Sequence, residues 1–181
     1  MKRIMIALAA VALAVSAQAA SFNWKTTATG KLYGAGTTTL LASGTAYLFD
    51  SAAVSQQAVL DAVLGGNALT SLATISSSSV ANGAISSTGF EWGNAGETLN
   101  AFVAIVDGDN VFISNTTAAL ADANSASTMN FNMKSASQAA AMESTTFTSA
   151  GWYTAAAVPE PTSGLLMLVG LAGLALRRRR A

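Results

Sequence analysis

The fold is decided by residues 99–114, which read LNAFVAIVDGDNVFIS. Two apolar, β-branched runs, Leu99 to Val106 and Val111 to Ser114, flank a DGDN loop at residues 107–110, whose residue types suit tight turns. This pattern predicts an antiparallel hairpin. Because residues 102–106 are apolar without interruption, the first strand is expected to be central in its sheet and covered on both faces.

Short runs rich in threonine, branched and aromatic residues recur on both sides of this hairpin, separated by glycine, asparagine and aspartate. The further strands expected from them are Phe22 to Thr29, Thr45 to Phe49, Thr128 to Met133, Thr145 to Thr148 and Trp152 to Ala155. The segments Ser76 to Ser79 and Ala118 to Ser127 are expected to be loop or edge. The sequence thus predicts a mainly β fold, with a single antiparallel, β-sandwich-like domain.

One short helix is expected to interrupt the strands between residues 50 and 66. Good helix formers follow the N-cap candidates Asp50 and Ser51 and stop at Gly65 and Gly66, which suit a C-cap. Its apolar face would comprise Val54, Leu60, Val63 and Leu64, with Gln56, Gln57 and Asp61 mostly outside it. This amphipathic pattern predicts that the helix lies on the sheet.

The composition indicates apolar segments in addition to a core. Of 181 residues, 51% are hydrophobic and only 10% are charged, and the mean hydropathy is +0.44. Six of the nine basic residues lie at the two ends, at Lys2, Arg3, Arg177, Arg178, Arg179 and Arg180. Between Ala20 and Val158, three lysines oppose eight acidic residues, a net charge of −5. So few basic side chains cannot form a phosphate-binding face, which excludes nucleic acid as a partner.

Several classes of chemistry are excluded by residue type. The chain has no cysteine and no histidine, so disulfides, thiolate zinc sites, cysteine nucleophiles and imidazole bases are all absent. Serine and threonine make up 36 of the 139 residues from 20 to 158, about a quarter. We therefore expect a hydroxyl-rich, mildly acidic domain over residues 20–157, with no catalytic residue, no cofactor and no metal site.

The N-terminus has the three-part pattern of a secretory signal peptide. Lys2 and Arg3 precede an apolar stretch from Ile4 to Val15, and small residues follow at Ala17 and Ala19. Twelve apolar residues are short for a permanent span, which needs about 20. Residues 1–19 are therefore expected to form a signal helix that is cleaved between Ala19 and Ala20. The expected partners are the Sec translocon and signal peptidase.

The C-terminus carries a second three-part pattern over residues 158–181. Pro159, Glu160 and Pro161 precede thirteen uncharged residues, Gly164 to Leu176, and then four arginines, which are Arg177, Arg178, Arg179 and Arg180. The arginines should stay cytoplasmic, and their long stems can snorkel, so that a short helix spans a locally thinned bilayer. We expect a C-terminal transmembrane helix at 164–176. Both ends then point inward, which places the middle of the chain outside.

This tail resembles the PEP-CTERM sorting signal of exported proteins in Gram-negative bacteria. Pro159, Glu160 and Pro161 fall on the motif that names the signal, residues 164–176 on its helix and residues 177–180 on its basic end. The resemblance implies that the chain is an exosortase substrate. It also implies passage through the inner membrane, removal of the tail near the motif, and delivery to the cell surface or extracellular matrix, commonly beside exopolysaccharide. A plain membrane anchor without processing is the alternative.

The remaining candidate sites each have a structural alternative. Asp107, Asp109 and Asn110 could offer oxygen ligands to calcium, although turn chemistry already explains the loop. Glu91 and Glu97 flank Trp92 and could form a glycosidase pair, although two carboxylates in a glycine-rich loop are usually just solvated. The aromatic side chains that could stack on carbohydrate, but that more often pack in a β domain, are Trp24, Trp92, Trp152 and Tyr153.

Three functions are compatible with these patterns. The first, which we prefer, is a non-catalytic protein of the cell surface or extracellular matrix. The second is a carbohydrate-binding module for exopolysaccharide, with Trp92 or Trp152 exposed as a platform. The third is an exported hydrolase that uses carboxylates such as Glu91 and Asp107. The hydrolase ranks last because the spacing of these carboxylates in the sequence does not require a catalytic role.

Overall fold

The computed structural model describes residues 19–27, 31–122, 126–133, 141–142 and 144–154. These residues contain one α-helix, α1 (Gln56–Leu64), and one 3-10 turn, η1 (Leu69–Ser71). The strands are β1 (Ala19–Lys25), β2 (Ser43–Asp50), β3 (Thr74–Ala81), β4 (Ala84–Ile85), β5 (Thr88–Asn94), β6 (Thr98–Asp107), β7 (Asn110–Ile113), β8 (Thr117–Leu120), β9 (Ser127–Asn130), β10 (Ala141–Met142) and β11 (Gly151–Thr154). The predicted mainly β fold is confirmed.

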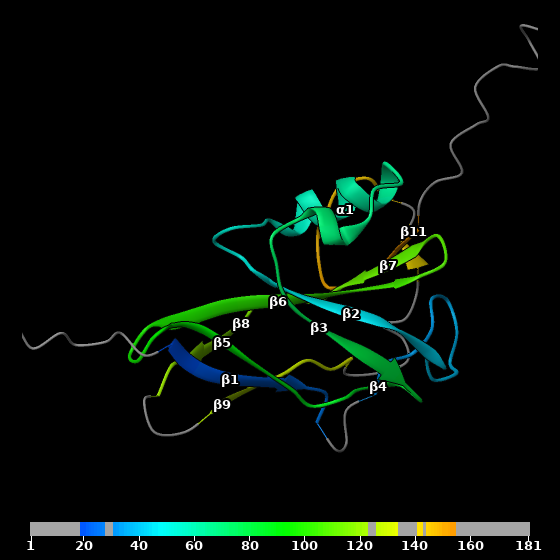
Figure 1. The fold of residues 1–181 in the computed structure, drawn as a ribbon. Helices are drawn as coiled ribbons and strands as arrows, with labels where there is room; N and C mark the ends of the chain where they lie inside the picture. The colour runs from blue at the N-terminus through cyan, green and yellow to red at the C-terminus, as the bar shows by residue number, and fades with distance from the viewer. Residues whose placement is uncertain (1–18, 28–30, 123–125, 134–140, 143, 155–181) are drawn as a thin grey trace, which may run out of the picture.

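The strands form two sheets that lie in separate layers, with α1 as a third layer (Figure 1). The small sheet has the order β5-β1-β9, and the large sheet has the order β10-β11-β7-β6-β2-β3-β4, with β8 also paired to β6. The prediction of purely antiparallel sheets is wrong at two places. β1 runs parallel to β9, and β10 runs parallel to β11, and neither pair is joined by a tight hairpin turn.

The hairpin predicted from residues 99–114 is confirmed as β6 and β7. Asp107 pairs with Asn110, and Gly108 adopts φ 58°, which the first position of a two-residue hairpin loop requires. β6 lies between β2 on one side and β7 and β8 on the other. Its side chains alternate between two apolar clusters, with Val103 on one face and Phe102 on the other, both fully buried. The expectation of a central strand covered on both faces is therefore confirmed.

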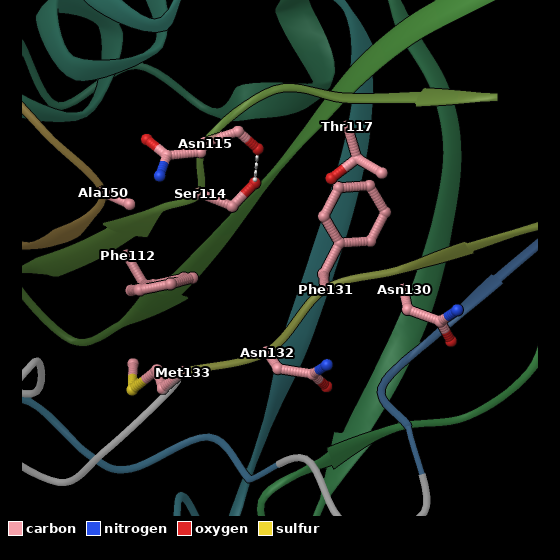
Figure 2. Close-up of a pocket in the computed structure, with 9 residues that line it drawn as sticks. All are labelled: Phe112, Ser114, Asn115, Thr117, Asn130, Phe131, Asn132, Met133 and Ala150. Carbon is pink, nitrogen blue, oxygen red and sulfur yellow. Dashed lines mark hydrogen bonds between the residues drawn. The ribbon is translucent and has the colours of Figure 1, made fainter.

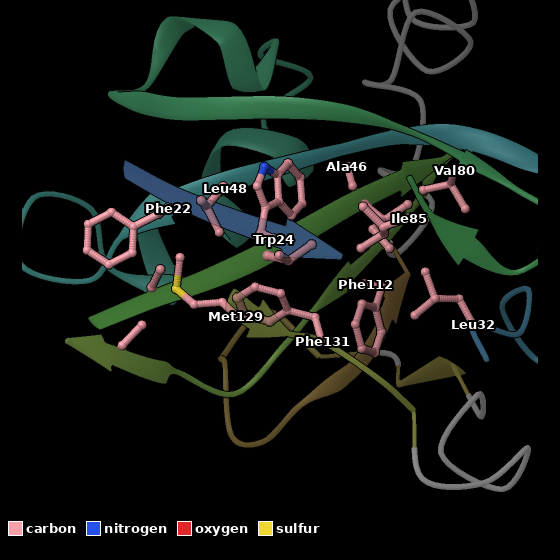
Figure 3. Packing of buried hydrophobic residues seen from close by; sticks show 14 of the residues in the cluster. Phe22, Trp24, Leu32, Ala46, Leu48, Val80, Ile85, Phe112, Met129 and Phe131 are labelled. Carbon is pink, nitrogen blue, oxygen red and sulfur yellow. The ribbon is translucent and has the colours of Figure 1, made fainter. Parts of the chain in front are cut away.

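The main core fills the space between the two sheets (Figure 3). Phe22 and Trp24 of β1 are fully buried, and they belong to the same cluster as Leu48 of β2 and Phe112 of β7. Alternate residues of β1 point inward, so that Ser21 and Lys25 stay exposed while Phe22 and Trp24 are covered. Each such large apolar side chain contributes about 1.5–3 kcal/mol through burial.

The helix lies on the opposite face of the large sheet, as predicted, but it begins later than expected. Ser55 is the N-cap, and its hydroxyl oxygen accepts a hydrogen bond from the Ala58 backbone N–H at 3.1 Å. Asp50 instead stabilises a preceding turn, where its carboxylate accepts from the Ala52 N–H. The predicted stop at Gly65 is confirmed. Val59, Leu60 and Ala62 are the buried residues of the helix.

One predicted strand does not form. Residues 145–148 lie outside any strand because side chains take the backbone groups that a sheet would have used. The Phe147 N–H donates to Oε1 of Gln57, and the Thr148 N–H donates to the Tyr153 hydroxyl oxygen. The high β-propensity of threonine is thus overridden by hydrogen bonds that the backbone donates to side chains, one of them on Gln57, far away in the sequence.

The boundaries of the other predicted strands are approximate. β1 ends at Lys25 and β9 ends at Asn130, earlier than expected. The segment 76–79 is part of β3 and not a loop. The expectation of an edge holds for it, since β4 pairs only with Val80 and Ala81 within the part of the chain that the structure describes. Residues 118–120 belong to β8, while Ala155 and residues 123–125 lie outside the described residues.

Candidate functional site

The predicted sorting residues lie outside the described part of the chain. They are Pro159, Glu160 and Pro161 of the motif, the basic residues Arg177, Arg178, Arg179 and Arg180, and Ala17 of the signal peptide. The two described residues at the expected cleavage point, Ala19 and Ala20, are the first residues of β1, where Ala20 pairs with Trp92. Among the described residues, no helix has the length and apolar character needed to cross a membrane.

The tryptophans do not form an exposed carbohydrate platform. Trp24 and Trp152 are fully buried, as is Tyr153. The indole N–H of Trp152 donates to the Tyr33 carbonyl oxygen at 2.8 Å. Trp92 is partly buried, and its ring packs edge-on against Phe22 with the ring centroids 6.2 Å apart. The expectation that these side chains are core and edge packing is confirmed, and a platform at Trp152 is excluded.

The two candidate glutamates are exposed and separately placed. Glu91 lies on β5 and not in a loop, opposite Ser21 of β1. Glu97 follows the next turn, where its carboxylate accepts hydrogen bonds from the Asn94 side-chain amide and backbone N–H. These bonds to the Asn94 side chain and backbone lower the pKa of Glu97 below its usual value. Glu97 therefore stabilises the turn as a carboxylate, which is the opposite of a general acid with a raised pKa.

Asp107 and Asn110 of the DGDN loop stabilise the hairpin. The side-chain amide of Asn110 donates to the Asp107 carbonyl oxygen, and its Oδ1 accepts from the Thr154 hydroxyl at 2.8 Å. The Asn110 side chain thus links the hairpin to β11, so its oxygen is already used. Within the described residues, no three carboxylates gather closely enough to hold a metal ion.

A pocket of about 270 Å³ opens where the ends of the two sheets meet (Figure 2). We call it the amide-rimmed pocket, because three asparagines lie among its lining residues. Its floor includes the buried side chains of Phe112, Phe131 and Met133. The lining residues are Phe112, Ser114, Asn115, Thr117, Asn130, Phe131, Asn132, Met133 and Ala150. The pocket therefore combines an apolar floor with an uncharged polar rim.

One wall of the pocket is a β-bulge. Ala104 of β6 pairs with Ile113, and Ala101 of β6 pairs with Thr117, so the partner strand carries one extra residue between them. Ser114 stabilises this irregularity, because its Oγ accepts from the Val103 N–H at 2.9 Å and donates to the Asn115 carbonyl oxygen. Bulges commonly redirect a side chain. Here the bulge turns Asn115 out to the rim.

The bulge is also anchored to α1. The side-chain amide of Gln56 donates to the Ser114 carbonyl oxygen at 2.6 Å. Ser114 itself is 7% exposed, and Val103 is fully buried. The wall is thus tied to the central strand on one side and to the helix on the other, so its backbone is fixed before any ligand arrives.

The opposite wall is the end of β9 and the residues after it. Asn130 is the last residue of β9 and is exposed. Asn132 is held by Thr27, whose backbone N–H and hydroxyl both donate to Asn132 Oδ1. This leaves the NH₂ group of Asn132 as a donor at the rim. Figure 2 shows the segments 112–117 and 130–133 on opposite sides of the pocket.

We expect Ser114→Ala to lower the free energy of unfolding by about 1–3 kcal/mol, because the buried Val103 N–H loses its acceptor. Ser77→Ala on β3 is the matched control, since Ser77 is exposed in a strand. Urea unfolding of the two variants and the parent chain measures the difference. Equal stability of the two variants would contradict the role assigned to the Ser114 hydroxyl.

A second cavity of about 310 Å³ lies on the helix side of the large sheet. It lies between the C-terminal end of α1, with η1, and the β6–β7 loop. Its lining residues are Tyr47, Val63, Gly66, Asn67, Ala68, Leu69, Val106, Gly108 and Asp109. This cavity is similar in size to the amide-rimmed pocket but has a single asparagine and a carboxylate.

Sequence patterns did not identify the amide-rimmed pocket. The Asn130-Phe131-Asn132-Met133 stretch does alternate polar and buried apolar residues, which is a signal of one covered and one open face. What the sequence lacks is any sign that this stretch lies beside the bulge at Ser114. The two walls meet only through the packing of separate sheets.

Comparisons with known proteins give one match. No curated protein and no solved structure matches the chain significantly. Residues 157–180 match the family model described as the PEP-CTERM protein-sorting motif. The match contains the Pro-Glu-Pro motif, the apolar stretch and the four arginines, and it begins close behind β11 in the sequence. Such a motif marks an exported protein that is membrane-associated before processing by an exosortase-like enzyme. The chain carries a PEP-CTERM protein-sorting motif at its C-terminus, with Arg177, Arg178, Arg179 and Arg180 inside the matched range.

Proposed function

We propose that this chain is a non-catalytic protein of the cell surface or extracellular matrix. The observation that carries the proposal is the sorting motif at residues 157–180, which follows directly on a β domain rich in hydroxyl groups. A signal peptide at residues 1–19 would take the chain through the Sec translocon. The exosortase-like enzyme would then remove the tail and release the domain from the inner membrane.

The residue chemistry supports a role without catalysis. The sequence has neither histidine nor cysteine. The carboxylate of Glu97 already accepts two hydrogen bonds from Asn94, and Glu91 is exposed on β5. The general acid of a glycosidase has a raised pKa, a role that Glu97 does not fit because its pKa is lowered. We therefore do not propose that these glutamates form a hydrolytic pair.

A second candidate function is the binding of a saccharide of the surrounding matrix. This function was first expected from Trp92 or Trp152 as an exposed platform, but Trp152 is fully buried and Trp92 is partly buried against Phe22. The amide-rimmed pocket favours it instead, because its polar rim is uncharged and its walls are fixed by hydrogen bonds.

The test of the proposed function is to purify the protein from its own cell envelope and culture fluid and map both termini by mass spectrometry. We expect a chain that begins at Ala20, ends near Pro159 and is found outside the inner membrane. A chain that retains Arg177 to Arg180 and stays in the inner membrane would contradict the proposal, and would indicate a resident membrane-anchored protein.

A further inference from the structure

We propose that the amide-rimmed pocket binds one ring of a neutral, hydroxyl-rich saccharide at a time. This inference deepens the second candidate function above, the binding of a saccharide, and rests on the proposed export of the chain.

The charge of the pocket selects a neutral ligand. None of the described residues that line it is charged, and residues 20–158 have a net charge of −5. An acidic polysaccharide would meet a repulsive field and no basic side chain among the described lining residues. A cationic ligand would have to give up its hydration without gaining a carboxylate. A neutral ligand has neither cost.

The rim offers the hydrogen-bonding groups that a sugar uses. Each side-chain amide has both a donor and an acceptor, which matches a hydroxyl group that does the same. The side-chain amides of Asn115 and Asn130 make no hydrogen bond with other protein groups in the described structure, and both residues are exposed. Thr117 adds a hydroxyl on the first wall, and Asn132 adds an NH₂ group on the second. Both walls therefore carry unused polar groups.

The size and floor of the pocket limit what can enter. A volume of about 270 Å³ lies just below the usual range for drug-sized ligands, about 300–1,000 Å³, which leaves room for a single ring. Phe112 and Phe131 lie at its floor and are only 4% and 3% exposed, and the exposed lining of the pocket as a whole is more apolar than polar. The apolar lining can contact the C–H face of a sugar ring, while the amides and the Thr117 hydroxyl at the rim can bind its hydroxyl groups.

The walls are preorganised, so that binding does not have to order them. Ser114 fixes the Asn115 backbone through its hydroxyl, and Gln56 holds the Ser114 carbonyl. Thr27 fixes the carboxamide of Asn132. Rigid polar groups retain more of their hydrogen-bond energy on binding than mobile ones.

The experiment measures binding of the purified native protein to neutral oligosaccharides. The probes are glucan, galactan and mannan hexasaccharides, with alginate oligomers as the acidic comparison and a serine- and glycine-rich peptide as the peptide comparison. Titrations followed by NMR of the side-chain NH₂ groups give both the affinity and the asparagines affected. We expect at least one neutral hexasaccharide to bind and to shift the Asn115 and Asn130 signals, with no such effect from alginate.

Variants separate the amide-rimmed pocket from the rest of the surface. Asn115→Ala, Asn130→Ala and Thr117→Val should each weaken binding by about three- to tenfold, the loss expected for one or two hydrogen bonds. Asn67→Ala is the matched control, because Asn67 is an exposed asparagine at the second cavity, on the other face of the large sheet. Thermal unfolding checks that all four variants fold like the parent.

Three results would overturn the proposal. These are no binding of any neutral probe by folded protein, equal weakening in Asn67→Ala and Asn115→Ala, and shifts of the Asn115 and Asn130 signals with the peptide alone. None of these results would affect the termini found by mass spectrometry. Failure of the saccharide site is therefore distinguishable from failure of the proposed function. Only the second failure would appear as a chain that retains Arg177 to Arg180 in the inner membrane.

Discussion

Replacement of Trp152 by alanine is expected to lower the free energy of unfolding by about 3–5 kcal/mol, the usual loss for a fully buried tryptophan. Trp152 lies on β11, and its ring centroid is 5.7 Å from that of Phe112 of β7. Removing the indole leaves a large cavity between the sheets. It also leaves the Tyr33 carbonyl oxygen without its donor. Such a loss is a large fraction of the total stability of an ordinary domain, about 5–15 kcal/mol.

The control for this prediction is Trp92→Ala. This variant loses an equally large side chain, but from the edge strand β5, where the ring is only partly buried. Urea unfolding followed by circular dichroism should therefore place Trp92→Ala between the parent and Trp152→Ala. If Trp152→Ala were as stable as Trp92→Ala, the burial of Trp152 in the core would be wrong. An exposed platform at Trp152 would then have to be considered again.

The second large effect is expected in sorting. Replacement of Pro159, Glu160 and Pro161 together by alanine should abolish the processed form. The altered chain should keep its apolar segment and four arginines, and so remain in the inner membrane. Immunoblots of inner-membrane and culture-fluid fractions measure where the chain is found. The mass of the C-terminal peptide shows whether the tail has been removed.

A matched change just outside the named motif controls for the substitution itself. Thr162→Ala with Ser163→Ala alters adjacent residues within the same family match but leaves the Pro-Glu-Pro motif intact. Processing of this double variant should be close to that of the parent. Normal processing of the triple variant would show that the sorting role does not depend on Pro159, Glu160 and Pro161.

Local sequence patterns were sufficient for the parts of the fold that depend on neighbours in the chain. The β6–β7 hairpin follows from two apolar runs around Gly108, and the end of α1 follows from Gly65. The start of the helix was harder to predict. Asp50 and Ser55 are both good caps, and only the structure shows that Asp50 serves a separate turn.

Long-range contacts decided the rest of the fold. The serine run of β3 has low β-propensity, yet its hydroxyls form hydrogen bonds with groups outside the strand. Ser76 accepts from the Trp24 indole N–H at 3.1 Å, and Ser78 donates to the Ser86 carbonyl oxygen at 2.9 Å. These bonds make a strand of residues that would otherwise suit a loop. Conversely, the Tyr153 hydroxyl accepts from the Thr148 N–H in a segment that was expected to be a strand.

The sorting motif can be identified from the sequence alone, whereas the amide-rimmed pocket cannot. The motif at Pro159 to Pro161 is contiguous, so its residues can be identified without a fold. The amide-rimmed pocket needs Asn115 and Asn130 to come from two sheets, and the one-residue bulge after Ile113 sets the direction of the first. No short window of the sequence contains that geometry.

The central place of β1 in the small sheet has a consequence for the order of events during export. β1 is the first strand of the chain, but it is held between β5 and β9, so that Phe22 pairs with Phe90 on one side and Ser127 on the other. Contacts between residues so far apart form slowly. A chain that emerges from the N-terminal end first cannot complete this sheet until nearly all of the β domain has crossed. We expect β1 to lack its β9 partner during that time, so the small sheet is completed only after residue 130 has crossed.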